Sequence, residues 1–279
     1  MNFTLGHHLV AFLDVLGQRD KFRDLRLPTN AEEQARVKEV LANTAGYVLH
    51  LRKLFKSQFE TFESALTHPD LVKQQLRPKF VGFSDSFVMS VPLRNNAGDL
   101  VPVITVYSAM QAASIVMLSS LAWKHALRGG IDVGLATEIG PDEIYGTALE
   151  RAYILESEDA KSPRILIGDS LWGYLHAALT EFKKDQTGSS KALAAITKKL
   201  IGFIGTGTDG KRILDYLGAI SESTTEAEKE HMIIPAYEFV LTEQKRHIEE
   251  GNVKLIQRYA DFRHYFESRL SLWAIPARS

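Results

Sequence analysis

Two aspartates in this chain stand where carboxylates could hold metal ions. Asp14 lies inside the apolar run LVAFLDVL of residues 9–16, and Asp85 lies in the polar segment Ser84-Asp85-Ser86 between two β-rich runs. A charge within a buried strand is costly unless it is paired or bound to a metal. Two carboxylates delivered from a central strand and a neighbouring hairpin tip could hold two divalent cations about 4 Å apart, as in phosphoryl and nucleotidyl transfer.

Each aspartate also has a purely structural explanation. Asp14 could end its strand as an ion-pair partner of Arg128 or another base, and Asp85 could serve the turn, since Asp and Ser favour turns. Side chains alternate along a strand, so Phe12 would share the face of Asp14, whereas Leu13 and Val15 would point into the opposite, buried layer. The metal hypothesis therefore needs both aspartates to meet at one edge of a sheet.

The elements that must position them follow from hydrophobic patterning. Thr29 and Glu32 form a capping box that opens a helix reaching about Glu63. Alternating and β-rich runs predict a hairpin over residues 79–91 and strands over 9–16, 131–137 and 164–168. Helices are predicted over residues 102–126, 147–160 and 169–179. This order, βαββαβαβα, predicts a mixed α/β (α+β) fold: a sheet with helices on one or both faces.

Composition excludes several classes of function. The 279 residues include no cysteine, which excludes disulfides, thiolate nucleophiles, cysteine-ligated zinc and iron–sulfur clusters. Lys and Arg total 33 against 34 for Asp and Glu, so the basic excess of a nucleic-acid binder is missing. The apolar N-terminal run contains Asp14 and lacks a basic region before it, which is not the pattern of a secretory signal.

One segment is long enough to span a bilayer. Residues 100–123 carry no charge, but they include Pro102, Gln111 and four serines. A buried helix beneath a sheet explains this composition better than a membrane span. We therefore expect a soluble, cytoplasmic protein that contacts neither membrane nor nucleic acid.

Four segments carry a family resemblance: AFLDVLG (11–17), GFSDSFVMS (82–90), LRGGIDVG (127–134) and YGTALERAYILE (145–156). In this order they resemble the catalytic domain of class III nucleotidyl cyclases over residues 8–180, and most of all the bacterial pyrimidine cyclases of the Pycsar antiphage defence system. The resemblance implies a ferredoxin-like βαββαβ core sheet in a domain of residues 1–180. It also implies a head-to-tail homodimer with active sites at the interface.

The rest of the chain, residues 181–279, is expected to be a mainly helical C-terminal extension. Helix formers and ionic side chains dominate from Glu238 to Trp273. Residues 183–200 and 221–230 are charged, rich in Ser and Thr, and weakly periodic, so exposed linkers are predicted there.

The resemblance also implies site residues. Asp14 and Asp85 match the two metal-binding aspartates, the carbonyl of Val15 matches a further metal contact, and the cofactors would be two divalent cations, Mn²⁺ or Mg²⁺. Leu16 and Gly17 match a turn whose amides cradle the triphosphate. Phe12 and Arg128 are expected to bind nucleotide; Arg128 could instead pair with Asp132 or Glu138.

Departures from the purine-specific cyclases bear on the substrate. Val81 replaces a base-reading Lys, and Thr147 replaces a base-reading Asp or Cys. Loss of these groups argues against adenine and guanine, because buried hydrogen-bonding groups give most of the discrimination between bases. Glu150 and Ile154 replace an Asn and an Arg that hold ribose and triphosphate. Arg151 could supply the missing positive charge as a catalytic residue, or could be a solvated helix Arg paired with Glu150 or Glu158.

The resemblance thus implies a pyrimidine nucleotide cyclase. The 3′-hydroxyl of UTP, or less favoured CTP, would attack the α-phosphorus and release pyrophosphate. The 3′,5′-cyclic nucleotide would act on a separate effector protein in antiviral defence. The main alternative is a catalytically inactive cyclase fold that binds nucleotide or a partner, an alternative that the Glu150 and Ile154 departures support.

A second glycine-rich motif suggests a different class. Residues 205–212, GTGTDGKR, fit both G-x-G-x-x-G and G-x-x-x-x-G-K, the dinucleotide and P-loop patterns. Arg212 stands where a P-loop needs Ser or Thr, and no βαβ unit follows. A glycine-rich turn is the better interpretation, and a P-loop or dinucleotide-binding protein remains the third alternative.

Overall fold

A computed structural model describes residues 5–18, 21, 23, 25–65, 78–93, 103–140, 143–184, 187–221 and 225–276. The first part of the chain contains β1 (Gly6–Val15), α2 (Ala31–Ala65), β2 (Lys79–Phe83), β3 (Ser86–Pro92), α4 (Val103–Ala122), β4 (Leu127–Glu138), β5 (Ile144–Tyr145), α5 (Thr147–Ile154), the π-helical turn η1 (Leu155–Asp159), β6 (Ile165–Ile167) and α6 (Asp169–Lys184). Then follow α7 (Gly188–Gly202), β7 (Ile204–Thr206), β8 (Arg212–Leu214), α8 (Tyr216–Ile220), α9 (Glu226–Glu228), η2 (Lys229–Ile233), α10 (Ile234–Glu249), α11 (Val253–Glu267) and η3 (Leu270–Trp273).

The strands form one mixed sheet in the order β2-β3-β1-β4-β6-β8-β7, with β5 paired to β4. The segment β1-α2-β2-β3-α4-β4 gives the antiparallel order β2-β3-β1-β4, which is the ferredoxin-like arrangement. Strand β6 then adds parallel to β4. The mixed α/β fold with a βαββαβ core, predicted from the sequence, is confirmed.

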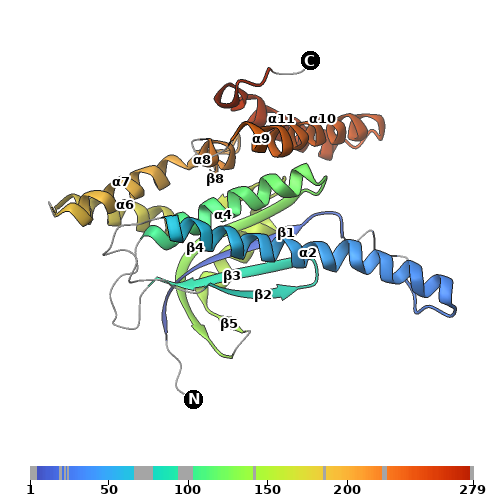
Figure 1. Cartoon of the computed structure of the whole chain (residues 1–279), viewed down its shortest axis with the longest axis horizontal. Helices are drawn as coiled ribbons and strands as arrows, with labels where there is room; N and C mark the ends of the chain where they lie inside the picture. Colours follow the sequence, from blue (N-terminus) through green and yellow to red (C-terminus); the bar gives the residue numbers. More distant parts are fainter. Residues whose placement is uncertain are drawn as a thin grey trace.

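Helix α4 lies at the centre of the molecule (Figure 1). It packs against α2 on its flank, and α7, α8 and α10 cover the side away from the sheet. Among the described helices, α4 alone is long and apolar enough to cross a membrane, but 89% of its most apolar stretch is buried inside the protein. The prediction of a buried helix over 102–126 is confirmed, although α4 ends at Ala122; residue 102 lies outside the described part of the chain.

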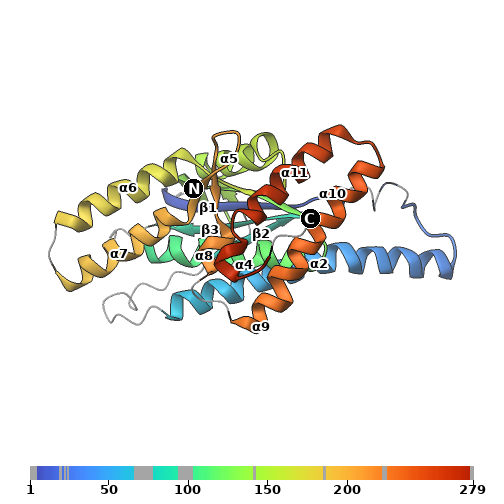
Figure 2. The ribbon, with the colours of Figure 1, turned by 90° about the horizontal axis from the view of Figure 1, so that it is seen from above.

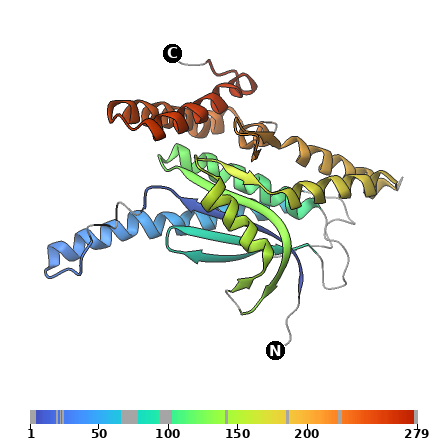
Figure 3. The same ribbon diagram turned by 180° about the vertical axis from the view of Figure 1, so that it is seen from behind.

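The two faces of the sheet are covered differently. Alternate residues of β1, among them Leu9, Leu13 and Val15, enter the large core beneath α2 and α4. The intervening Val10 and Phe12 belong to a smaller cluster beneath α5. Seen from behind, α5 crosses this second face and leaves part of it uncovered (Figure 3). The side chain of Asp14 follows Phe12 in the alternation, so it lies on the α5 face.

Residues after 180 contribute to the same sheet. Strands β7 and β8 extend it beyond β6, so the expected division at residue 180 runs through the sheet rather than between separate cores. The prediction of an exposed linker over residues 183–200 is wrong for most of this segment, because α7 occupies residues 188–202. Thr187 caps this helix, and Thr197 and Leu200 are buried. In the predicted linker over 221–230, residues 222–224 lie outside the described part, and the rest leads into α9 and η2.

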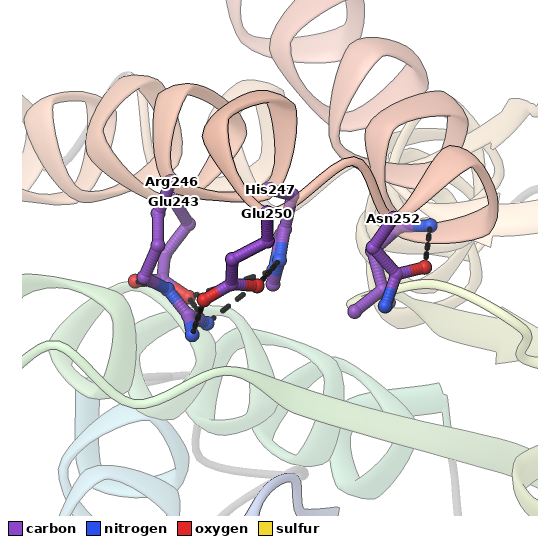
Figure 4. Close-up of polar contacts among 6 residues, drawn as sticks. Glu243, Arg246, His247, Glu250 and Asn252 are labelled. Atoms are coloured by element: carbon purple, nitrogen blue, oxygen red, sulfur yellow. Dashed lines mark hydrogen bonds and ion pairs between the residues drawn. The ribbon is translucent and has the colours of Figure 1, made fainter.

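The predicted C-terminal helix is a pair, α10 and α11, seen side by side in Figure 2. A polar cluster closes the end of α10 (Figure 4). Arg246 binds Glu243 at 2.6 Å and Glu250 at 3.0 Å, and the buried His247 contacts Glu250 through Nδ1 at 3.1 Å. Asn252 then caps α11 by accepting a hydrogen bond from the amide of Leu255. Arg246 satisfies both carboxylates, so this cluster is a structural one.

Candidate active site

A row of three polar residues crosses the end of the sheet on the α5 face. In the strand register Asp14 of β1 pairs with Ser86 of β3 on one side and with Arg128 of β4 on the other. The side chain of Asp14 retains 17% exposure, and that of Arg128 retains 27%. The row therefore stands at the rim of the sheet, where solutes can reach it.

The hairpin tip brings Asp85 next to this row. Strands β2 and β3 are joined by the two-residue turn Ser84-Asp85, in which Ser84 has a left-handed φ of 46°. The amide of Val15 donates a hydrogen bond to the carbonyl of Asp85 at 3.1 Å. Asp85 therefore faces the residue that follows Asp14, and its partly exposed side chain lies at the same end of the sheet. The structure therefore brings the backbones of the two predicted aspartates to the same end of the sheet.

The donors fit Mg²⁺ or Mn²⁺. Carboxylate and carbonyl oxygens are the ligands these hard cations prefer. Within the described ranges, no group of three or more His, Asp or Glu side chains is arranged to hold a metal ion by itself. Two carboxylates and the Val15 carbonyl would leave most positions to water and phosphate oxygens, which is how Mg²⁺ is commonly bound with nucleotides.

The predicted phosphate cradle needs a correction. The amide of Leu16 donates to the carbonyl of Ala126 at 2.9 Å, which continues the pairing of β1 with β4. This amide is therefore already used and does not face a phosphate. Gly17 turns the chain away with φ of 81° and is exposed. Sequence alone does not show where the strand pairing ends.

Arg128 joins Asp14 to a second carboxylate that the sequence analysis did not single out. Its Nε and Nη2 lie 3.4 Å from Oδ2 of Asp14, and its Nε lies 2.5 Å from Oε1 of Glu156. Glu156 is in the π-helical turn after α5, with its side chain only 3% exposed. Burial, together with the nearby charge of Asp14, raises the pKa of Glu156 to about 7. The alternative pairings of Arg128 with Asp132 or Glu138 are not formed: Asp132 accepts the amide of Leu171, and Glu138 pairs with Lys79.

A pocket of about 700 Å³ lies on the α5 face next to Asp14. Aromatic side chains dominate its walls, and Phe12 meets the ring of Tyr153 edge-on at 5.4 Å. The lining residues are Phe12, Phe83, Ser86, Tyr145, Gly146, Thr147, Leu149, Glu150 and Tyr153. Its polar groups are few, so this pocket suits a flat, partly apolar ring. Val81 packs in the small cluster beneath α5 rather than lining the pocket.

Gly146 shapes the entrance to α5. It has φ of 141°, and a Cβ at this position would meet the carbonyl oxygen of Leu135 at 2.3 Å. Glycine is therefore required for Thr147 and the start of α5 to lie against β4. Thr147 lines the pocket, and its hydroxyl lies 3.4 Å from the Leu135 carbonyl.

Arg151 points to the other side of α5. It donates to Ser170 Oγ at 2.7 Å and to the carbonyl of Val133 at 3.3 Å. Val133 lies five residues along β4 from Arg128, which is about 17 Å in a strand. Arg151 lines a separate cavity of about 560 Å³, together with Asp132, Ile154, Lys211 and Arg212. Within one copy of the chain, the structure does not bring this predicted catalytic residue to Asp14 and Asp85.

The glycine-rich motif is a β-turn region. Residues 207–211 connect β7 to β8, with hydrogen bonds from Gly207 to the carbonyl of Lys211 and from Gly210 to that of Gly207. Lys211 pairs with Asp159, and Arg212 pairs with Asp169. The motif leads directly into strand β8 rather than into the helix that a P-loop requires, and the interpretation as a glycine-rich turn is confirmed.

Comparisons with known proteins find no matching family model and no matching curated protein. Among solved structures, two of a bacterial light-regulated adenylyl cyclase align at 12% identity, with TM-scores of 0.38 and 0.39. They cover 62% and 72% of this chain, and 46% and 58% of theirs. A class III adenylyl cyclase-like ATP-binding protein from Pseudomonas aeruginosa aligns at 15% identity and a TM-score of 0.37, over 71% of this chain and 42% of that one. The chain thus spans about half the length of the structures it matches.

Proposed function

We propose that this protein is a metal-dependent nucleotide cyclase that converts a pyrimidine nucleoside triphosphate, UTP in preference to CTP, to the 3′,5′-cyclic nucleotide and pyrophosphate. One observation carries the proposal. Asp14 and Asp85, far apart in sequence, lie at the same sheet edge beside a pocket with aromatic walls. A pair of carboxylates with room for a base is the minimum that such chemistry needs.

Divalent cations bound by Asp14 and Asp85 would lower the pKa of the ribose 3′-hydroxyl and offset charge on the phosphates. The chain itself has the task of orientation, because the substrate carries both the nucleophile and the leaving group. Gly17 would offer its amide to a phosphate oxygen. The walls formed by Phe12 and Tyr153 would hold the base by stacking, and residue 147 would offer a small hydroxyl rather than a charge.

A homodimer belongs to the same proposal. Several large apolar side chains around α5 and the β2–β3 hairpin are exposed, including Tyr145 at 70%, Phe83 at 50% and Tyr153 at 50%. Exposed aromatic groups gathered at a pocket rim are typical of surfaces that a partner covers. A second copy placed there would enclose the pocket and exclude water from the phosphates.

The wider biological role rests on the resemblance alone. A cytoplasmic location, and a cyclic pyrimidine nucleotide that signals to a separate effector protein in antiviral defence, follow from the similarity to pyrimidine cyclases given above. Neither nucleic acid nor membrane is expected as a partner.

The test is incubation of the purified chain with each of the four ribonucleoside triphosphates and Mn²⁺, with products identified by mass spectrometry. We expect a cyclic pyrimidine nucleotide that Asp85→Asn reduces by about 10³-fold or more, since a metal ligand is removed. Glu181→Gln is the control, because its exposed carboxylate pairs with Lys184 on α6, away from the site. Product from ATP or GTP alone would refute the pyrimidine assignment.

A second function is favoured by the position of Arg151. That guanidinium is turned toward Ser170, and Glu150 and Ile154 stand at the ribose and triphosphate positions. The cation beside Asp14 is Arg128, which is already paired with Asp14 and Glu156. An inactive cyclase fold that binds nucleotide would show Asp85-dependent binding of UTP without any product, and this outcome would replace the enzymatic proposal.

A further inference from the structure

A further cavity, of about 340 Å³, is lined by the last strands of the sheet and by helix α11. Its walls come from the loop before β6, the β7–β8 hairpin, and one face of α11 with the turn that follows this helix. The lining residues Thr208, His264 and Ser268 are exposed, so solutes can enter. The volume is at the lower end of the roughly 300–1,000 Å³ that is typical of ligand pockets, so a ligand here would be small.

Two guanidinium groups line this cavity, while their counter-charges lie outside its walls. Arg164 pairs with Asp209 at 2.6 Å and Arg269 pairs with Asp215 at 2.8 Å, but neither aspartate is a lining residue. Each ion pair fixes an arginine in place and leaves N–H groups over, since a guanidinium has five donors. Within the described part of the chain, Arg269 donates hydrogen bonds only through Nε, to Asp215, and through Nη1, to Ser268.

The glycine-rich motif makes room for both arginines. Gly205 and Gly207 are two positions apart, and a Cβ on either would lie 3.6 Å from the side chain of Ile213, so both face the same side of the hairpin. On that side, the Cβ of residue 207 would lie 3.1 Å from Nη1 of Arg164, and the Cβ of residue 205 would lie 3.9 Å from Nη2 of Arg269. Larger side chains at these two positions would crowd the guanidinium groups.

Two buried polar atoms of the lining residues are left without a partner. The hydroxyl of Tyr216, a residue only 2% exposed, and the Nε of Arg164 make no hydrogen bond to any residue that the structure describes. Buried polar groups nearly always have a partner, and both of these groups can donate. An acceptor atom of a bound molecule would satisfy them.

We propose that this cavity binds a small organic carboxylate, with its charged end toward Arg164 and Arg269 and its apolar body against Phe262. Guanidinium groups bind carboxylates through paired, charge-assisted hydrogen bonds. A carboxylate is favoured over a phosphate because Asp261 also lines the cavity, and its negative charge would repel a dianion more strongly. The inference does not depend on the proposed function, since the cavity shares no lining residue with the pocket of the candidate active site.

The probe is benzoate, titrated into the full chain and followed by saturation-transfer NMR, with benzamide as the neutral molecule of the same shape. We expect saturable binding of benzoate, and binding of benzamide that is weaker by about 10-fold or more, because benzamide brings no charge to the arginines. Absence of saturable benzoate binding, or equal binding of benzamide, would overturn the inference. Phenyl phosphate has the same ring with a dianionic end, and its tighter binding would overturn the assignment of a carboxylate.

The substitution Tyr216→Phe separates ligand binding from folding. Because the hydroxyl has no partner among the described residues, its removal should leave Tm unchanged or raise it, yet weaken benzoate binding by about fivefold, the effect of one hydrogen bond. Tyr237→Phe is the matched control. Its buried hydroxyl donates to Glu267 at 3.1 Å and neither residue lines the cavity, so it should lower Tm and leave benzoate binding unchanged.

The substitution Arg269→Gln removes one of the two charges and should weaken benzoate binding by about 10-fold. Thermal unfolding shows whether this variant is folded, and Tyr216→Phe tests the inference without touching an ion pair. Unchanged benzoate affinity in either folded variant would overturn the inference, while the proposed cyclase activity would stand.

Discussion

The substitution Gly130→Ala tests the contact between β4 and the end of α5 on which the site depends. The added Cβ would lie 2.4 Å from the carbonyl oxygen of Ala152 and 2.5 Å from Cβ of Leu155, about 1 Å inside ordinary contact distances. Both obstacles are backbone or backbone-proximal atoms of a helix, so neither can rotate away. The helix and η1 must move together, or the strand must bend.

The expected cost is set by overpacking. Forcing an extra methyl group into a packed contact costs about 1–3 kcal/mol, and exchanging Gly for Ala in a strand returns about 0.5–1 kcal/mol. We therefore expect a net destabilisation of about 1 kcal/mol, or roughly 2–4 °C in Tm for a chain of this size.

The assay is thermal and urea unfolding followed by circular dichroism, with Gly46→Ala as the matched control. Gly46 lies on the exposed face of α2, and a Cβ added there would have no heavy atom within 4 Å. That variant should gain about 1 kcal/mol, since Ala is the better helix former. If Gly130→Ala were as stable as the parent chain, the close approach of α5 to β4 would be refuted, and with it the placement of Glu156.

Three further predictions concern other parts of the molecule. Burial lowers the pKa of His125 to about 4, with a smaller contribution from Lys21, so the histidine is neutral in the fold and protonates more readily when unfolded. Its contribution to stability is therefore fully present above pH 6.5 and falls as pH drops toward 4; in urea titrations the parent chain should lose about 1–2 kcal/mol more than His125→Gln between pH 7.5 and 5, while the raised pKa of Glu156 acts in the opposite sense on both chains. Tyr145→Ser should weaken self-association about 10-fold in sedimentation equilibrium, and Leu27→Ser, which removes an apolar group exposed to 92%, should not; equal effects would contradict the dimer surface. Arg151→Gln should leave Mn²⁺ affinity within about twofold, because distant sites act independently, and a larger change would place Arg151 nearer Asp14 than the structure does.

Much of the fold could be predicted from local patterns. The run around Asp14, the hairpin with Asp85 at its tip and the uncharged segment of α4 each have a strong period or boundary signal, and each is found where expected. Strands β7 and β8 were missed because three residues are too few to show a period. Helix α7 was missed because its apolar face is narrow and its surface is rich in Lys and Ser.

The positions of site residues on strands could be predicted from the sequence, but the directions in which residues on α5 point could not. Asp14 and Asp85 come together because register and turn length fix their positions, and both can be inferred from sequence. Arg151 and Glu156 depend on the rotation of α5 and on the π-helical turn that follows it, for which the sequence carries no clear signal.

The central position of α4 has a consequence for how the chain is made. Its residues are synthesised before position 123, but much of what shields them comes from α8 and α10, which leave the ribosome about a hundred residues later. Until then, a nascent chain that has already formed its sheet exposes to solvent the apolar side chains of α4 that α8 and α10 later cover. The final quarter of the sequence therefore completes the core of the first half. A chain truncated before it would expose apolar surface and aggregate rather than fold as a smaller functional protein.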